Sequence, residues 1–162
     1  MSIGVFEYYL DSMLPVSNKI ERIAVLPATP DVVWEKSFSS PEAMMSWFPD
    51  KLEGELVEGK NFFLIWEEHR CECRMIVFKK AECLEFKWHP GVSVELTGFP
   101  EEELTTVTFT LEKAQTKSGQ PGTKVTMIET GFAKVGKKRR QAVFEANNGG
   151  WNIEMAKLPK GY

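Results

Sequence analysis

The sequence has few cysteines and histidines, no long apolar run and little excess of either charge, and each shortage excludes a class of protein. Its 162 residues include three cysteines and two histidines. An odd and small number of cysteines does not make a disulfide framework, and reduced thiols are typical of a cytoplasmic protein. No apolar run approaches the ~20 residues that span a bilayer, and no basic region precedes the apolar N-terminal residues. We therefore expect a cytoplasmic protein with no membrane partner.

The charge balance gives no reason to expect a nucleic-acid partner. Twenty basic residues against 23 acidic ones give a formal net charge of -3, whereas nucleic-acid binding depends on clustered lysines and arginines. The one basic run, residues 137–140, opens a predicted helix whose later turns are apolar. A solvated helix face is the main interpretation of this run, and an anion or partner contact is the alternative.

Neither a metal site nor a known catalytic constellation is indicated. Cys71 and Cys73 flank one residue and would lie on one face of a strand, but a metal site normally needs four ligands, and His69 and His89 show no regular spacing. The nucleophile elbow, the phosphate-binding loop, the dinucleotide fingerprint and the zinc-protease motif are all absent. No base is implied beside Cys71 or Cys83, so we expect no catalytic residue, no metal and no cofactor.

The pattern of the chain predicts a single α+β domain over residues 18–162. Residues 1–17 are rich in apolar and aromatic side chains and form either an arm or a short helix. A first strand over 19–26 precedes two helix starts, TPD at 29–31 and SPE at 40–42, each with a capping hydroxyl, a proline and an acidic residue. Segments of period-two alternation follow at 62–66, 73–77, 84–88, 107–111 and 125–127. Six or seven strands with turn residues between them make an antiparallel sheet.

The last segment, from about Lys137 to Leu158, has the apolar spacing of a helix, with Phe144 and Trp151 on its apolar face. The glycine pair 149–150 interrupts it, and each glycine there costs up to ~1 kcal/mol relative to alanine. The pair indicates either a bend or a restart of the helix, or the close approach of another backbone.

The order of several short motifs resembles the SRPBCC superfamily of START and birch-pollen-allergen-like domains, and within it the branch named after the activator of the heat-shock protein 90 ATPase. The motifs are Val33-Trp34, Pro41-Glu42, Trp47-Phe48, Phe63, Trp66, Leu84 to Trp88, Val107-Thr108-Phe109, Gly122 to Thr126, Gly131-Phe132, Gly149-Gly150-Trp151 and Leu158. Together with the opening strand, they make the resemblance extend from about residue 18 to the C-terminus.

This resemblance implies a helix-grip fold, in which a curved seven-stranded antiparallel sheet and two short helices after the first strand surround a long C-terminal helix. The superfamily includes lipid carriers, hormone receptors, polyketide cyclases and a eukaryotic co-chaperone domain. The eukaryotic activator has a further N-terminal domain that this sequence does not contain, so the branch name alone does not give the function.

Glu129 departs from the pattern of the resemblance, because many relatives carry a histidine at this position. By alternation it shares a face with Val125 and Met127, which would direct its carboxylate into the cavity between sheet and helix. There it could donate or accept a proton. The alternative is that it reaches water at the strand end or pairs with a cation of the helix.

The aromatic residues suggest a binding function. Five tryptophans and 11 phenylalanines are many for this length, and most of them would pack a core, although a sheet that faces one helix tends to leave unfilled volume. The expected ligand-binding residues are Trp66, Trp88, Met127, Glu129, Phe144 and Trp151. Asn147 and Asn148 could supply amide hydrogen bonds or cap a helix that restarts at Gly149.

Three functions compete. The favoured one is a non-enzymatic binding module for a small apolar or amphipathic ligand held between the sheet and the C-terminal helix. The alternatives are a co-chaperone-like interaction with a heat-shock protein 90 chaperone and an enzyme of the cyclase or hydrolase type that uses Glu129. A homodimer is expected if residues 1–17 leave apolar surface exposed.

Overall fold

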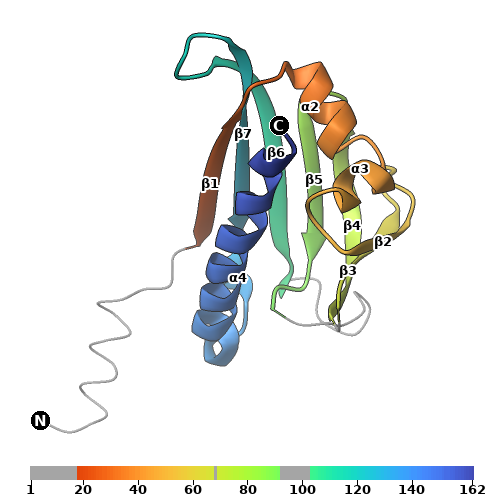
Figure 1. The fold of residues 1–162 in the computed structure, drawn as a ribbon. Coiled ribbons are helices and arrows are strands. Elements are labelled where there is room, and N and C mark those ends of the chain that lie inside the picture. The colour runs from red at the N-terminus through yellow and green to blue at the C-terminus, as the bar shows by residue number, and fades with distance from the viewer. Residues whose placement is uncertain (1–17, 68, 92–102) are drawn as a thin grey trace, which may run out of the picture.

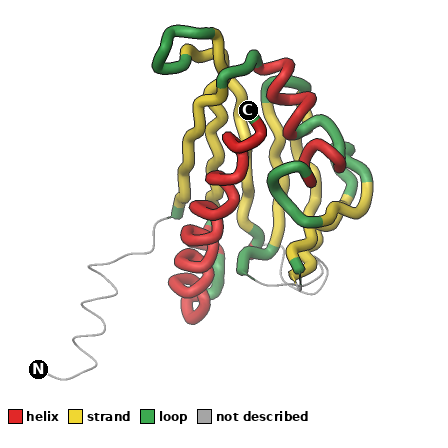
Figure 2. The backbone as a smooth tube through the Cα atoms, viewed as in Figure 1, coloured by secondary structure: helices red, strands yellow, loops and turns green. Residues whose placement is uncertain are grey.

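The structure, a computed structural model, describes residues 18–67, 69–91 and 103–162. One antiparallel sheet of seven strands, in the order β1-β7-β6-β5-β4-β3-β2, carries all helices on one face (Figures 1 and 2). The strands are β1 (Lys19–Leu26), β2 (Lys51–Gly54), β3 (Asn61–Trp66), β4 (His69–Lys79), β5 (Cys83–Trp88), β6 (Thr105–Gln115) and β7 (Pro121–Thr130). The helices are α2 (Pro30–Ser37), α3 (Pro41–Met45) and α4 (Lys137–Lys157), with short 3-10 turns at Phe132–Lys134 and Leu158–Gly161.

This architecture is the helix-grip fold that the resemblance implied. The sheet is single and curved, α4 lies across its face, and α2 and α3 follow β1 (Figure 1). Trp151, on the inner side of α4, is only 3% exposed. The predicted strands and all three predicted helices are therefore confirmed. The predicted arm over 1–17, and with it the argument for a homodimer, lies outside the described residues.

The starts of the two short helices differ from each other. The Ser40 hydroxyl caps α3 by accepting a hydrogen bond from the Ala43 amide at 3.1 Å. Thr29 precedes α2 in the same sequence context, but its hydroxyl makes no capping bond, so the prediction of a capping hydroxyl is wrong at this helix. Pro30 still fixes the backbone of the first helical position, which is sufficient to start α2 without a cap.

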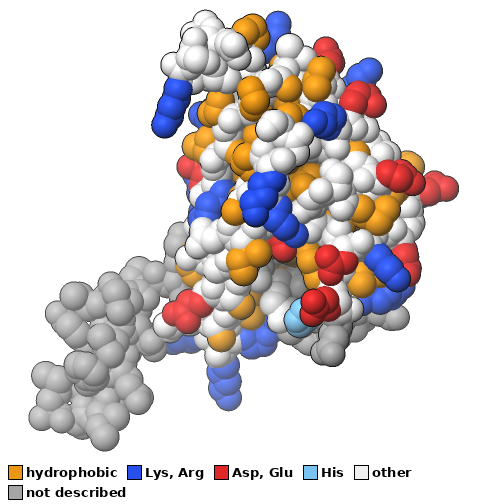
Figure 3. Space-filling view, in the orientation of Figure 1, with side chains coloured by type: hydrophobic (Ala, Val, Ile, Leu, Met, Phe, Trp, Pro, Cys, Tyr) orange, Lys and Arg blue, Asp and Glu red, His pale blue; other side chains and the backbone are white. Residues whose placement is uncertain are grey.

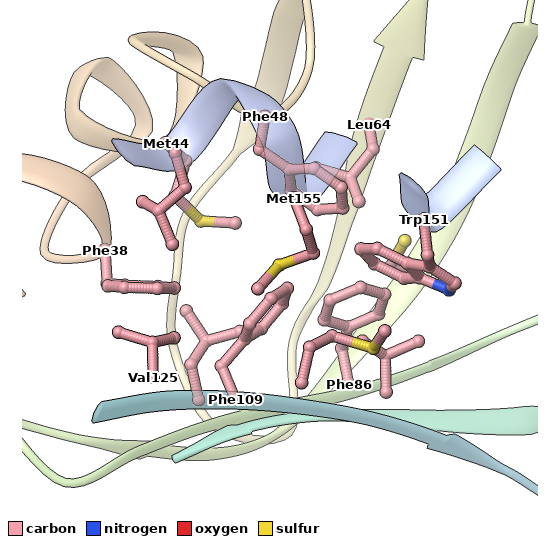
Figure 4. Close-up of a cluster of buried hydrophobic side chains, with 14 of the residues drawn as sticks. Phe38, Met44, Phe48, Leu64, Phe86, Phe109, Val125, Trp151 and Met155 are labelled. Carbon is pink, nitrogen blue, oxygen red and sulfur yellow. The ribbon is translucent and has the colours of Figure 1, made fainter. Parts of the chain in front are cut away.

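The interior between α4 and the sheet is filled by side chains. Figure 4 shows Phe38 and Met44 of the short-helix region, Val125 and Phe109 of the sheet, and Met155 of α4 meeting in one cluster. Phe109 is fully buried and contacts four other rings, with centroids 5.4–5.9 Å apart. Burial of so many rings supplies the main driving force for folding.

The start of α4 is fixed by part of its basic run. Arg139 donates to the Glu103 carboxylate at 3.1 Å, and Arg140 donates to the carbonyls of Val135 and Ala133. Two of the four basic side chains therefore have structural partners, and Lys137 and Lys138 remain exposed. Within the described part of the chain, no helix is both long enough and apolar enough to cross a membrane.

Candidate functional site

The most unusual group inside the protein is the carboxylate of Glu129, which is 0% exposed. Its Oε2 accepts hydrogen bonds from Trp88 Nε1 at 2.9 Å and from Thr105 Oγ1 at 2.6 Å. Its Oε1 accepts one from Trp151 Nε1 at 2.8 Å. The amide of Asn147 donates to both oxygens, at 3.1 and 3.0 Å. This cluster joins β5, β6 and β7 to the middle of α4.

The strand pairing explains why these groups meet. Val107 on β6 lies opposite Glu129 on β7, and Trp88 on β5 lies opposite Thr105 on β6. Residues directly opposite each other, and residues two apart on one strand, point to the same face of a sheet. Trp88, Thr105 and Glu129 therefore all face α4, where Asn147 and Trp151 lie one helical turn apart.

The surroundings of Glu129 are suited to a negative charge but contain no opposite charge. Burial raises the pKa of its carboxyl, and hydrogen bonds from Thr105, Trp151, Trp88 and Asn147 oppose this rise. An indole N–H can only donate, so the site favours an oxygen that accepts. Both alternatives from the sequence, contact with water and pairing with a helix cation, are wrong, because the carboxylate is enclosed and its hydrogen-bond donors are all neutral.

Next to this carboxylate, four aromatic rings form a closed circuit. Phe48 and Trp66 have centroids 5.1 Å apart, Trp66 and Trp88 6.3 Å, Trp88 and Trp151 6.2 Å, and Trp151 and Phe48 5.5 Å. Trp66 is fixed by a hydrogen bond from its Nε1 to the Phe48 carbonyl at 3.0 Å. We call these four side chains the aromatic cage.

Two adjoining hollows lie beside the aromatic cage. The smaller, of about 90 Å³, is lined by the four rings together with Ala146, Asn147, Gly150 and Glu154. The larger, of about 480 Å³, is lined by Trp66, His69, Cys71, Trp88, His89, Gly91, Ala146, Asn147, Gly150, Ile153 and Glu154. Because six residues line both, the two hollows form one groove between α4 and the ends of β3, β4 and β5.

The glycine pair of α4 borders this groove. The helix continues from Lys137 to Lys157 without a break, so the predicted restart at Gly149 is wrong, and Asn148 is not a cap. A Cβ built on Gly149 or Gly150 would meet no atom within 4 Å, so the predicted close backbone approach is wrong as well. Gly150 lines both hollows, whereas Gly149 lines neither.

The ionisable groups along the groove are varied. Burial raises the pKa of the Cys71 thiol to about 11, which keeps it protonated and makes it a poor nucleophile. Burial also raises the pKa of the Glu154 carboxyl, although an ion pair with Lys157 opposes the rise. His69 and Cys71 both belong to β4 and both line the larger hollow, so the strand is continuous there.

On the side of α4 that contacts β1, Arg22 of that strand forms hydrogen bonds to the helix. Its guanidinium donates to Asn152 Oδ1 at 2.8 Å and to the Asn148 side-chain and main-chain oxygens at 2.7 and 2.9 Å. The two neighbouring asparagines therefore have different tasks, because Asn147 binds Glu129 and Asn148 binds Arg22. The middle of α4 is fixed to the sheet on both sides.

The structure brings together only some of the residues expected to line a ligand site. Trp66, Trp88 and Trp151 line the groove, and Glu129 lies directly behind the two latter indoles without reaching it. Met127 does not line it, because its side chain is fully buried in the core. Phe144 does not line it either, because its ring packs on Phe132 with centroids 5.1 Å apart.

Several groove residues were missed from the sequence. Phe48, Ile153 and Glu154 were not among the expected lining residues, although Asn147, Gly150 and Glu154 recur at the three- and four-residue spacing of one helix face. This row of residues runs beside the predicted apolar face of the helix. Its spacing was the sequence signal from which these groove residues could have been predicted. Among the described residues, no group of three or more histidines, cysteines or carboxylates is placed to hold a metal ion.

The described surface around α4 mixes side chains of every kind. Figure 3 shows basic and acidic side chains dispersed among hydrophobic ones on this face. Ile153, at the rim of the groove, is 67% exposed. An exposed isoleucine beside a hollow lined by aromatic rings extends the apolar lining out to the surface.

Comparisons with known proteins agree with this fold. Residues 27–160 match the profile of the family described as "Activator of Hsp90 ATPase homolog 1-like protein". A comparison with curated proteins finds no match.

Solved structures of low sequence identity share the architecture. MLL2253 from Mesorhizobium loti is 18% identical, with a TM-score of 0.63 over 88% of this chain and 94% of that one. The Aha1 dimer from Colwellia psychrerythraea is 13% identical, with a TM-score of 0.65 over 87% and 92%. BH1534 from Bacillus halodurans is 19% identical, with a TM-score of 0.60 over 88% and 94%. At these identities the likeness concerns the fold alone.

Proposed function

Because the chain belongs to the Activator of Hsp90 ATPase homolog 1-like family, whose helix-grip fold encloses one long helix, we propose that it binds a small amphipathic organic ligand in the groove beside that helix. The ligand would lie against Trp66 and Trp88 on the sheet side and against Gly150 on the helix side. The ligand would therefore lie at one end of the interface between α4 and the sheet.

The observation that carries the proposal is the position of Gly150. A glycine inside a helix costs roughly 1 kcal/mol relative to alanine. No neighbouring atom lies where its Cβ would be, so packing gives no reason for the glycine. Its absent side chain instead widens both hollows of the groove. Open volume kept at a cost in helix stability is what a binding site requires.

The size and the lining of the groove also support a ligand. Its larger hollow, about 480 Å³, falls within the range of roughly 300–1,000 Å³ that is usual for small-molecule sites. Its lining combines apolar and polar side chains: Trp66, Trp88, Ala146 and Ile153 supply apolar surface, and His69, His89, Asn147 and Glu154 supply polar groups. Such a combination gives affinity through apolar contact and orientation through hydrogen bonds.

The test compares two leucine variants of the glycine pair. Protein purified without detergent is screened by native mass spectrometry and against a metabolite panel by thermal shift. Gly150→Leu would place a side chain in the groove and should lower the affinity for any ligand found by about tenfold or more. Gly149→Leu adds the same side chain outside the groove and should leave the affinity unchanged. Equal effects of the two variants, or the absence of any ligand, would remove the proposal.

Catalysis by Glu129 receives less support from the geometry. A general acid or base must come within hydrogen-bond reach of the proton it transfers. The Glu129 carboxylate has no exposed surface, and its oxygens are already occupied by five hydrogen bonds. A ligand in the groove would therefore meet the indole rings of Trp88 and Trp151 instead of the carboxylate.

The family match favours one second candidate, an interaction with a heat-shock protein 90 chaperone. That function would use the surface of the domain and would not need the groove. A pull-down with the chaperone from the same cell and an ATPase assay at saturating protein would test it. An unchanged ATPase rate would exclude this candidate, and a rate increase that survives Gly150→Leu would separate it from ligand binding.

A further inference from the structure

We propose that the aromatic cage of Phe48, Trp66, Trp88 and Trp151 receives an alkylammonium head group, so that the ligand is an organic cation whose apolar remainder lies in the larger hollow. This inference rests on the proposed function, because it concerns the chemistry of the ligand in the same groove. The observations that carry it are the closed circuit of rings, the carboxylate behind two of them and the absence of lysine and arginine from the described lining residues.

The rings line a hollow of suitable size. Each of the four lies 5.1–6.3 Å from the next, centroid to centroid. The hollow they line has about 90 Å³, of the order of three water molecules. This volume suits a compact head group but is too small for a long chain. Cations are attracted to the faces of aromatic rings, most strongly to tryptophan, and three of the four rings are indoles.

Glu129 increases this attraction. The N–H groups of Trp88 and Trp151 both donate to its carboxylate oxygens, so these acceptors lie directly against the edges of two cage rings. The positive edge of each indole is thereby bound to the carboxylate, and both indoles also line the smaller hollow. Because the carboxylate is enclosed and has no cationic partner among its hydrogen-bond donors, its field is weakly screened.

A second carboxylate, that of Glu154, lies at the groove itself. Glu154 lines both hollows, and the described lining residues include no lysine or arginine. The ammonium of Lys157 pairs with Glu154 and donates to the Phe48 carbonyl at 2.9 Å. Lys157 lines a separate hollow together with Met45 and Lys160. An anionic ligand would therefore meet the Glu154 carboxylate and no lysine or arginine among the described lining residues, and the burial of its charge would be costly.

The experiment uses three ligands of similar shape and different charge. Benzyltrimethylammonium is the cation, neopentylbenzene replaces its nitrogen by carbon, and phenylacetate is the anion. Binding is measured at pH 8 by tryptophan fluorescence and by calorimetry. The cation should bind about tenfold more tightly than its neutral analogue, and the anion should bind more weakly than both.

Two charge variants and one control test which carboxylates cause the preference for the cation. Glu129→Gln and Glu154→Gln should each reduce the ratio of cation affinity to neopentylbenzene affinity by several-fold. Glu145→Gln removes an exposed carboxylate of the same helix and should change neither affinity. Glu154 lies at the groove and not in the core. If Glu129→Gln folds poorly, Glu154→Gln still tests whether a carboxylate causes the preference for the cation.

The outcomes separate this inference from the proposed function. Equal binding of cation and neutral analogue, or tighter binding of phenylacetate, overturns the cation inference and leaves ligand binding intact. If none of the three binds while the metabolite screen finds another ligand, only the cation inference falls. If the screen also finds nothing, both fall.

Discussion

The two ends of the interface between α4 and the sheet are built differently. At the packed end, Phe38, Phe109 and Met155 fill the space between helix and strands (Figure 4). At the open end, Gly150 faces Trp66 across a groove. Close packing supplies stability, and the stability supplied at one end allows the other to keep empty volume and a buried carboxylate. Trp151 belongs to both ends, because it contacts Phe109 and also lines the groove.

The largest effect is expected at the packed end, for Phe109→Ala. This ring is fully buried and lies within 6 Å, between centroids, of Phe38, Trp47, Phe48 and Trp151. Its removal should lower the free energy of unfolding by about 3–5 kcal/mol, through lost transfer energy and a residual cavity. Urea unfolding monitored by circular dichroism would measure the change. A loss below about 1 kcal/mol would show that this end is not tightly packed.

A smaller effect is expected for Glu129→Gln, which tests the connection between the two ends. The new amide would turn an N–H towards indole N–H groups, and the substitution should cost about 1–3 kcal/mol at neutral pH. The measurement is urea unfolding of wild type and variant across a pH series, with Glu145→Gln as the control for a surface charge.

The pH dependence of this cost has a definite sign. Burial raises the pKa of the Glu129 carboxyl above its usual 4.5, so the folded protein binds this proton more tightly than the unfolded chain. The associated stabilisation is complete below pH 4.5 and is lost as the pH rises through the folded pKa. The cost of Glu129→Gln should therefore grow as the pH falls towards 4.5. A cost that grows on the alkaline side would contradict the direction of the shift.

A gain in stability is expected at the open end, for Gly150→Ala. Alanine should stabilise the helix by up to ~1 kcal/mol, because its methyl group meets no atom and alanine favours the helix. Gly149→Ala should give a similar gain, measured by the same unfolding experiment, and provides a matched control. The two variants should differ only in ligand affinity, which Gly150→Ala alone should reduce. A loss of stability in either would mean that the space is not open.

The smallest effect on stability is expected for Ile153→Ser at the rim. The side chain is 67% exposed, and isoleucine and serine have similar helix propensities, so the free energy of unfolding should change by less than about 0.5 kcal/mol. Ligand affinity should nevertheless fall, because the substitution removes apolar surface from the larger hollow. Thermal unfolding and a binding titration on the same samples would separate the two quantities. Unchanged affinity would place the ligand deeper in the groove.

Much of the fold could be predicted because its signals are local. Period-two alternation identified six strands, and the strand β2 (Lys51–Gly54) was missed because it has four residues, of which only Leu52 is buried. The proline-acid pairs at 30–31 and 41–42 located both short helices. The same reasoning failed for the Thr29 hydroxyl, since a favourable residue in position need not form the capping bond.

The candidate site was predicted less completely. The alternation pattern correctly predicted that Glu129 faces the helix. It did not predict that Trp88, Thr105 and Asn147 bind Glu129, because strand register and helix rotation bring these residues together. The same limit applies to Phe144. Its spacing predicted that it would line the ligand site, but its ring packs on Phe132.

The sequence by itself determined which segments form strands and helices and which of their faces are apolar, because backbone geometry imposes fixed periods on neighbouring residues. Only the tertiary structure decided that most of the space below α4 is filled, that a groove remains beside Gly150, and that a carboxylate without a cation is stabilised by neutral donors. Empty volume and hydrogen-bond partners depend on how side chains from distant parts of the sequence pack together. A local sequence pattern does not specify that packing.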